Sequence, residues 1–222
     1  NQHDDFYNYI SDHFKLTYWL PGNHEYYHFD ITDKSGILNE RIKNNVTLVN
    51  NTSVVHDGVK LLFSTLWSHI SIANQWQIER NLNDFHQIKH NGSHFTSEHY
   101  NALHYESLDF IKQTVNQSSG DKMVVFSHHC PTFLNYPPKY KGDTLNEAFA
   151  TELYDFIETS NISYWGYGHH HFNTPDFFIG NTKNYWKKFH GFSYSRLKYC
   201  YFTPISKKIK FSIFIYFIVF KF

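Results

Sequence analysis

The sequence has little cysteine and no long apolar run, and each absence excludes a class of protein. Only two cysteines, Cys130 and Cys200, occur among 222 residues, which excludes a framework of several disulfides. No apolar signal segment opens the chain. The apolar run 211–220 is too short for a membrane-spanning helix, which needs about 20 residues. We therefore expect no membrane partner and a β-prone end.

Acidic side chains are absent from the end of the chain. Residues 177–222 contain nine Lys and Arg and no Asp or Glu, whereas residues 1–176 contain all 20 acidic groups and 11 basic ones. This asymmetry predicts a partial domain at 1–182 and an atypical basic, aromatic tail at 183–222, whose composition suggests a shifted reading frame. A basic tail gives only nonspecific electrostatic attraction to nucleic acid, so we expect no specific nucleic-acid partner.

The remaining composition indicates a globular protein. The chain is long enough for one domain with a substantial core, and 41% of its residues are hydrophobic and 20% aromatic. Seventeen histidines are present. Many of them lie in polar or helical contexts and are expected to be surface or packing residues: His56, His69, His86, His90, His94, His99 and His104.

Strand signals and helix signals alternate along the chain. Apolar runs predict strands at 15–20, 46–49, 53–55, 59–64, 122–127 and 162–167. Helical periodicity predicts helices from a cap at Ser97 to about 117, and from 146 to 160. Residues 68–96 show no period and predict a long loop or lid. This order favours an α/β domain whose strand-end loops share one edge, where ligands bind in such sheets.

The first chemically informative cluster, Gly22-Asn23-His24-Glu25, directly follows a predicted strand. Gly22 allows a sharp turn, Asn23 could offer its carbonyl oxygen to a cation, and His24 stands beside it as a proton donor. The alternative is an ordinary turn, with Asn23 capping a helix and His24 in solvent. The tetrapeptide alone leaves both interpretations open.

Two histidine clusters follow later strands. His128 comes first after the strand 122–127 and is the better candidate ligand, whereas His129 would support it or face a substrate; two loop histidines bonded to backbone are the alternative. In Gly168-His169-His170-His171, side chains two apart in an extended segment lie on the same side. His169 and His171 could therefore reach two adjacent metals while His170 points away. Cys130 is interpreted as a packing residue.

In this order, the three clusters resemble the calcineurin-like metallophosphoesterase superfamily. The matching motifs are Gly-Asn-His-Glu at 22–25, the strand-terminal His128, and Gly-His-x-His at 168–171. The resemblance extends from about residue 20 to 180, and segments 65–67, 83–85 and 146–149 are similar to bacterial cytosolic members. It implies a β-sandwich flanked by helices (α/β/β/α) and a cytoplasmic location.

The resemblance also implies a site and a reaction. Two divalent metal ions (Mn, Fe or Zn) would support hydrolysis of a phosphoester substrate by in-line attack of a metal-bound hydroxide. Asn23, His128 and His169 would hold one metal, and His171 would hold the other. His24 would stabilise or protonate the departing oxygen, and Glu25 would orient a neighbour.

One part of the family pattern is missing. The family's Asp-x-His and Gly-Asp-x-x-Asp motifs, the second of which supplies the carboxylate that bridges the metals, do not occur before Gly22. We therefore expect that the chain lacks its first few tens of residues, including its first strand or strands, and that activity is weak. Two functions are consistent with the sequence: a metal-dependent phosphoester hydrolase, and a non-catalytic binding module on the same scaffold. Neither substrate nor oligomeric state follows from it.

Overall fold

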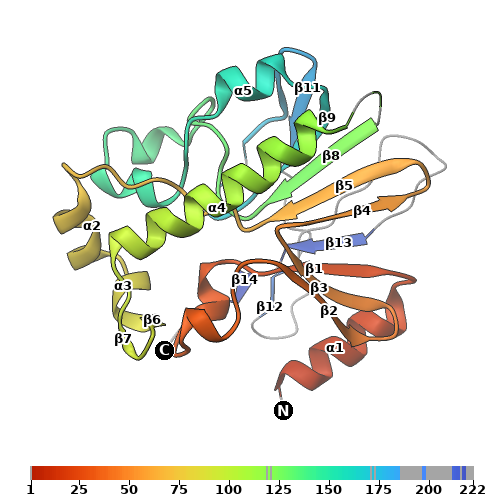
Figure 1. Ribbon diagram of the computed structural model, residues 1–222, viewed down its shortest axis with the longest axis horizontal. Coiled ribbons are helices and arrows are strands. Elements are labelled where there is room, and N and C mark those ends of the chain that lie inside the picture. The colour runs from red at the N-terminus through yellow and green to blue at the C-terminus, as the bar shows by residue number, and fades with distance from the viewer. Residues whose placement is uncertain are drawn as a thin grey trace.

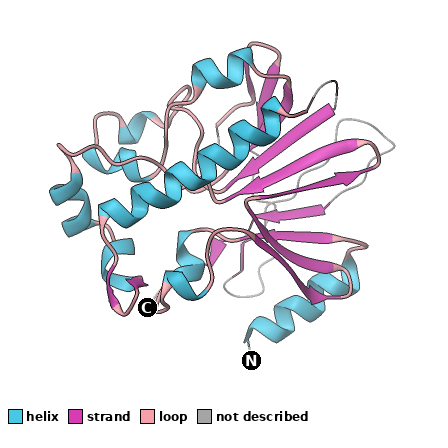
Figure 2. Cartoon of the chain, in the orientation of Figure 1, coloured by secondary structure: helices cyan, strands magenta, loops and turns pink. Residues whose placement is uncertain are grey.

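Two β-sheets pack against each other and helices cover their outer faces (Figures 1 and 2). The computed structural model describes residues 2–118, 120, 122–170, 172, 174–185, 197–198, 212–215 and 217–218. The layers follow one another as helices, six-stranded sheet, four-stranded sheet and helix. This arrangement confirms the predicted α/β/β/α class.

The six-stranded sheet carries most of the predicted strands. Its order is β10-β11-β9-β8-β5-β4. The strand bounds are β4 (Thr52–His56), β5 (Val59–Ser64), β8 (Lys122–Ser127), β9 (Ile162–Gly166), β10 (Phe177–Ile179) and β11 (Thr182–Tyr185). Strands β5, β8 and β9 are parallel, so their carboxyl ends share one edge of the sheet, as the sequence predicts.

The four-stranded sheet has the order β13-β1-β3-β2. Its strands are β1 (Thr17–Leu20), β2 (Leu38–Lys43), β3 (Val46–Asn50) and β13 (Ser212–Ile215), and β1 runs parallel to both of its neighbours. Strand β2 was not predicted, because it lies at the edge and most of its side chains are polar. Two short strands, β12 (Leu197–Lys198) and β14 (Phe217–Ile218), pair with each other.

The boundary expected at residue 182 falls within β11, which spans Thr182–Tyr185. Strand β11 pairs with β9 in the six-stranded sheet, and β13 pairs with β1 in the four-stranded sheet. The division into a domain at 1–182 and a tail at 183–222 stays a prediction.

Apolar side chains fill the space between the sheets and on both outer faces. Leu20 and Val49 of the small sheet meet Leu61, Phe63 and Phe126 of the large one. On the outer face of the small sheet, Phe6 and Ile10 of α1 (Gln2–His13) pack with Val46. Burying each such side chain contributes about 1.5–3 kcal/mol, so the strands that carry the site are held from both sides.

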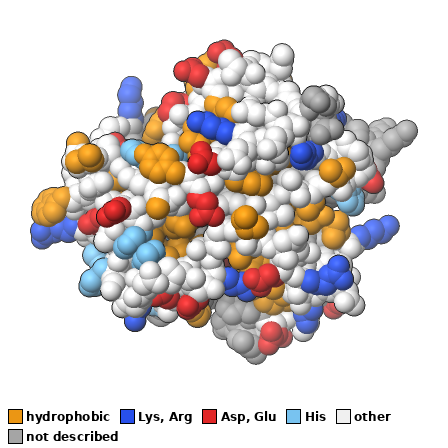
Figure 3. All heavy atoms as spheres, in the orientation of Figure 1, with side chains coloured by type: hydrophobic (Ala, Val, Ile, Leu, Met, Phe, Trp, Pro, Cys, Tyr) orange, Lys and Arg blue, Asp and Glu red, His pale blue; other side chains and the backbone are white. Residues whose placement is uncertain are grey.

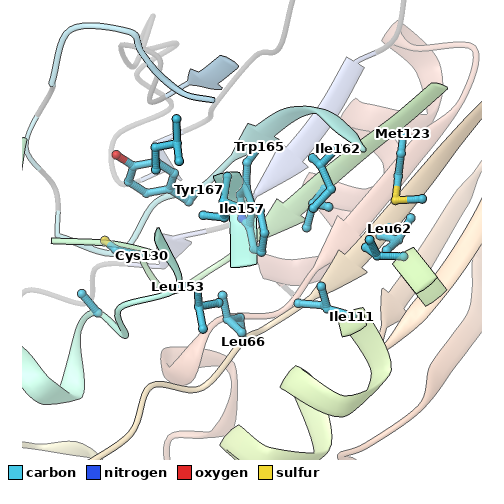
Figure 4. Close-up of a cluster of buried hydrophobic side chains, with 14 of the residues drawn as sticks. Leu62, Leu66, Ile111, Met123, Cys130, Leu153, Ile157, Ile162, Trp165 and Tyr167 are labelled. Carbon is cyan, nitrogen blue, oxygen red and sulfur yellow. The ribbon is translucent and has the colours of Figure 1, made fainter. Parts of the chain in front are cut away.

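The outer face of the large sheet is covered by α4 (Ser97–Asn116) and α5 (Tyr154–Thr159). Figure 4 shows this cluster, in which helix side chains interleave with side chains of the central strands. Its members include Leu62, Leu66, Ile111, Met123, Val125, Cys130, Leu153, Ile157, Ile162, Trp165 and Tyr167. Cys130 is completely buried there, in agreement with a packing role.

The prediction of a long loop at 68–96 is wrong. This segment contains α2 (Gln75–Asn81), α3 (Asp84–Gln87) and the hairpin of β6 (Lys89–His90) and β7 (Ser93–His94). It folds because scattered apolar residues converge on Trp67 and Tyr100: Ile70, Ile78, Leu82, Phe85, Ile88 and Phe95. Short elements of this kind leave no sustained periodicity in the sequence.

Two helix predictions also need correction. The N-cap of α4 is Thr96 rather than Ser97, since Thr96 Oγ1 accepts a hydrogen bond from the His99 backbone N–H at 3.5 Å, and the Thr96 backbone N–H donates in turn to His99 Nδ1 at 3.2 Å. The helix expected at 146–160 is split into η4 (Thr144–Ala148) and α5. Between them, Phe149 O accepts from Cys130 N–H at 3.1 Å and Thr151 N–H donates to Cys130 O at 3.0 Å. These tertiary bonds replace the helical ones.

Among the described residues, no helix is long and apolar enough to cross a bilayer. Figure 3 shows histidine side chains gathered on the side of the molecule where α3, β6 and β7 lie. His86 and His94 are exposed there, and the rings of His90 and His99 stack with centroids 3.7 Å apart. These residues have the surface and packing roles expected of them.

Candidate functional site

The three sequence clusters meet at the carboxyl ends of their strands. Asn23 begins η1 (Asn23–Tyr26) shortly after β1, His128 directly follows β8, and His169 follows β9. His128 Nε2 lies 3.0 Å from Asn23 Oδ1 and 2.9 Å from His169 Nδ1. All three residues are buried. The structure therefore brings together the three side chains that the resemblance assigns to one metal.

Gly22 makes room for His128. A Cβ atom at residue 22 would lie 2.2 Å from Cε1 of the His128 ring, closer than any real contact. The backbone of Gly22 is extended, with φ −100°, so this position needs a small residue for space rather than for an unusual conformation. The sequence predicts a turn at Gly22, and the structure shows that Gly22 also makes room for the ring of His128, a candidate ligand.

Glu25 closes the same turn. Its Oε2 accepts a hydrogen bond from the Gly22 backbone N–H at 2.6 Å, and its Oε1 is buried without a hydrogen-bond partner among the described residues. Burial raises the pKa of the Glu25 carboxyl group to about 8. Glu25 thus holds the backbone that precedes Asn23.

His169 has a backbone conformation that its sequence context did not predict. Its φ is +74°, in the left-handed region that is uncommon for residues other than glycine, so the expected extended arrangement of 169–171 is wrong at this residue. The His169 ring stacks on Phe149 with centroids 4.4 Å apart. His170 is among the residues that line the same cavity, and its ring contacts the rings of Tyr136 and Tyr167; that its side chain points away from the metals stays a prediction. His171 lies outside the described residues.

His129 contacts the site through the ring of His169 and is otherwise surrounded by buried residues. It is completely buried, its ring centroid is 4.3 Å from that of His169, and its Nδ1 is 3.1 Å from Thr65 O. Its Nε2 is 3.0 Å from the Tyr100 hydroxyl. Burial lowers the pKa of His129 to about 3, so the ring is neutral at physiological pH. The neutral His129 ring thus packs against the His169 ring.

Asp84 is a site residue that the sequence did not reveal. Its Oδ1 accepts from Asn23 Nδ2 at 2.8 Å and from the Tyr27 hydroxyl at 2.7 Å. The residue is completely buried, and its Oδ2 has no hydrogen-bond partner among the described residues. Burial raises the pKa of the Asp84 carboxyl group. Two signals were available: segment 83–85 is similar to bacterial cytosolic members of the family, and Asp84 lies between the apolar residues Leu82 and Phe85 in a segment interpreted as a loop.

Several hydrogen bonds join the chain around Asn23 to the chain around Asp84. Besides the two bonds to Asp84, they are His28 N–H to Gln87 O (2.7 Å), Lys89 N–H to Phe29 O (3.0 Å), Asn91 N–H to Asp30 Oδ1 (3.0 Å) and Gly92 N–H to Asp30 Oδ2 (2.6 Å). We call this set, between residues 23–30 and 84–92, the clasp. The hydrogen bond from Thr32 and those from the Gly92 and Asn91 N–H groups lower the pKa of the Asp30 carboxyl group.

A cavity of about 240 Å³ opens beside Asn23 and His169. Its wall contains imidazole, amide, carboxyl and aromatic groups, from Asn23, His24, Tyr27, Asn81, Leu82, Asn83, Asp84, Tyr140, Phe149, His169 and His170. The His24 ring packs against the Tyr27 ring at a centroid distance of 4.5 Å. The cavity therefore places the candidate proton donor next to the candidate ligands.

The donor set fits part of the coordination shell of one divalent ion. Two ligands at right angles around an ion at about 2.1 Å lie about 3.0 Å apart, close to the 3.0 and 2.9 Å between His128 Nε2 and its two neighbours. Imidazole nitrogen and amide oxygen suit manganese, iron or zinc. In the part of the chain that the structure describes, no group of three His, Cys, Asp or Glu is placed to hold a metal.

Comparison with known proteins identifies the family. The sequence profile of the calcineurin-like phosphoesterase family matches residues 1–173. "Uncharacterized protein L509" of Acanthamoeba polyphaga mimivirus is 31% identical over 193 residues, covering 79% of this chain and 68% of the viral protein. No solved structure matches. Since the matched region spans most of the chain and includes all three clusters, this protein belongs to the calcineurin-like phosphoesterase family.

Proposed function

We propose that the protein is a metal-dependent phosphoester hydrolase in which Asn23, His128 and His169 hold one divalent ion. The observation that carries this proposal is the convergence of Asn23 Oδ1, His128 Nε2 and His169 Nδ1 at one sheet edge. A divalent ion bound there would supply Lewis-acid polarisation of a phosphoryl oxygen and a lowered pKa for water. Family membership supports a phosphoester as the substrate class.

His24 is the proposed proton donor to the departing oxygen. It lines the cavity next to Asn23, and the Tyr27 ring restricts its orientation. A positioned imidazole commonly contributes about 10²–10⁴-fold as a general acid. Glu25 would orient this turn through its bond to Gly22, and His129 would steady the His169 ring.

A second ion would depend on His171, the remaining ligand that the family motif offers. The family in general uses two divalent ions, and we propose manganese, iron or zinc here. Since no described carboxylate joins His128 and His169, we expect weak turnover from the 222-residue chain. Its cytoplasmic location stays a prediction.

The test combines metal binding with hydrolysis. We expect Mn²⁺ to bind the wild-type chain in isothermal titration calorimetry and to stimulate slow hydrolysis of p-nitrophenyl phosphate. His128→Ala and His169→Ala should each abolish binding and stimulation. His94→Ala removes an exposed histidine of β7 and serves as the matched control, with both properties retained. Absence of Mn²⁺ binding by the wild-type chain would contradict the proposal, and turnover at normal family rates would contradict the expected weakness.

A non-catalytic binding module is the second candidate. It is favoured by the lack of a described carboxylate beside the two histidines. In that case Mn²⁺ would bind, and His128→Ala would abolish binding, yet p-nitrophenyl phosphate would not be hydrolysed above the background rate. The titration and the hydrolysis assay together therefore separate a hydrolase, a binding module and a chain without a metal site.

A further inference from the structure

We propose that Asp84 is a positioning residue that fixes the direction of the Asn23 amide, so that its oxygen and not its nitrogen faces His128 and His169. This inference rests on the proposed function, because it gives the amide oxygen a metal to bind. It assigns a role to a residue of the 68–96 segment that belongs to none of the three motifs.

The argument begins with hydrogen-bond chemistry. A carboxylate only accepts hydrogen bonds, and an amide group has one donor end and one acceptor end of nearly equal size. Asp84 Oδ1 lies 2.8 Å from the Asn23 side chain, so the NH₂ end of Asn23 must face Asp84. The carbonyl end is then turned to His128 Nε2, at 3.0 Å.

The opposite orientation would remove a ligand. An NH₂ group has no lone pair to offer a cation, so a flipped Asn23 would present two protons to the place where a metal has to bind. Asn23 is 3% exposed, so bulk water does not substitute for the carboxylate as the partner of its NH₂ group. Asp84 therefore decides whether Asn23 is a ligand at all.

The position of Asp84 is fixed by the apolar packing of its sequence neighbours and by the clasp. Leu82 and Phe85 anchor the segment in the apolar cluster around Trp67 and Tyr100. The clasp fixes the register with the chain that carries Asn23, through bonds such as His28 N–H to Gln87 O. The carboxylate thus meets Asn23 because the backbones of both segments are paired, and the contact does not depend on a flexible side chain reaching across solvent.

The first experiment measures the amide directly and needs no metal. In apo protein with ¹⁵N-labelled asparagine, the Asn23 side-chain NH₂ signals are assigned by their loss in Asn23→Ala. We expect one of the two protons to be shifted downfield and to exchange slowly with water. In Asp84→Ala both features should disappear. An unchanged Asn23 signal in Asp84→Ala would overturn the positioning role.

The second experiment measures Mn²⁺ affinity by calorimetry. Asp84→Ala should weaken binding by about 10–100-fold, the usual cost of removing a partner that orients a metal ligand. Asp84→Asn should restore most of the affinity, because the donors of Asn23 and Tyr27 both require the acceptor end of the new amide. Asp155→Ala is the control: it also removes a carboxylate, but an exposed one on α5 that is not part of the site, so affinity should not change.

The possible outcomes separate this inference from the proposed function. Wild-type affinity in a folded Asp84→Ala would overturn the positioning role while leaving the metal site intact. Equal losses in Asp84→Ala and Asp84→Asn would also overturn it, since they would show that the charge matters and the orientation does not. If the wild-type chain binds no Mn²⁺, the proposed function fails, and the apo amide measurement alone decides the role of Asp84.

Discussion

The histidine side and the asparagine side of the site are held in place by different kinds of structure. His128 and His169 follow β8 and β9, central parallel strands with apolar clusters on both faces. Asn23 follows β1 of the smaller sheet, and its amide depends on Asp84 and on the clasp. One side of the site is therefore positioned by the core, and the other by hydrogen bonds between two segments outside the four-stranded and six-stranded sheets.

This difference separates position from orientation. A buried strand end places a histidine, and ring packing with Phe149 and His129 then limits its rotation. A strand end also places Asn23, but an amide has two ends of similar shape, and apolar packing does not distinguish them. Only a polar partner does so. Substitutions on the two sides should therefore have different effects on Mn²⁺ affinity, on the free energy of unfolding and on hydrogen exchange.

The largest expected effect comes from forcing the two sides apart with Gly22→Ala. The added Cβ would meet the His128 ring at 2.2 Å, so the ring or the turn must move. We expect loss of measurable Mn²⁺ binding in calorimetry. Overpacking should also lower the free energy of unfolding by about 1–3 kcal/mol, measured by urea denaturation.

Gly58→Ala is the control for this substitution. Gly58 has φ +72°, and a Cβ added there would have no atom within 4 Å, so alanine is strained by about 1–2 kcal/mol without touching the site. The two variants should have similar stability, and only Gly22→Ala should lose Mn²⁺. Equal Mn²⁺ affinity in both would show that His128 does not need the space beside Gly22.

The same contrast explains which parts of the site could be predicted from the sequence. His128 and His169 follow apolar runs that end in small or polar residues, and parallel strands bring such ends together. Asn23 follows the same logic. Asp84 does not, because it follows no strand, and its contact with Asn23 depends on the packing of residues 68–96 on Trp67 and Tyr100.

Elements defined by local hydrophobicity could be predicted from the sequence, whereas elements defined by tertiary hydrogen bonds could not. Strands β5, β8 and β9 are buried runs whose hydrophobicity is a local property, so the sequence predicts that they exist and in which order they follow one another along the chain. The break between η4 and α5 was missed because residues 149–153 bond to the chain after β8, and helical periodicity carries no information about such bonds. The left-handed backbone of His169 is likewise a feature that hydrophobic periodicity does not reveal.

A change of pH should affect the packing of α4 near the carboxyl end of β5 but not the clasp, with an effect of intermediate size. His104 is buried on α4, and its Nδ1–H donates to Trp67 O at 2.5 Å, near the carboxyl end of β5. Burial lowers the pKa of His104 below 6.5; His69 and Lys112 also lower it, whereas the Trp67 carbonyl and Asp109 raise it. The unfolded chain therefore takes up this proton first, and stability falls as the pH drops below about 6.5.

Urea denaturation at pH 7.5, 6.5 and 5.5 measures this effect. The free energy of unfolding should decrease less between pH 7.5 and 5.5 in His104→Gln than in the wild type, and an identical pH dependence would contradict the prediction. The pKa of Asp30 is lowered from its usual 3.8, so its carboxylate stays ionised throughout this range. Hydrogen exchange at Asn91 and Gly92 should consequently show no local opening of the clasp.

The smallest expected effect comes from Asp30→Ala, which loosens the clasp at its far end. This carboxylate accepts the N–H groups of Asn91 and Gly92, whereas the bond between Asn23 and Asp84 is left in place. Hydrogen exchange at these two amides should become faster, and Mn²⁺ affinity should fall less than in Asp84→Ala. Asp155→Ala removes an exposed charge from α5 and should change neither measurement. If Asp30→Ala exchanges faster at Asn91 but binds Mn²⁺ like the wild type, the contact between Asp84 and Asn23 holds without the bonds to Asp30. The remaining bonds of the clasp, such as His28 N–H to Gln87 O, and the apolar anchors Leu82 and Phe85 then suffice to keep Asp84 beside the Asn23 amide.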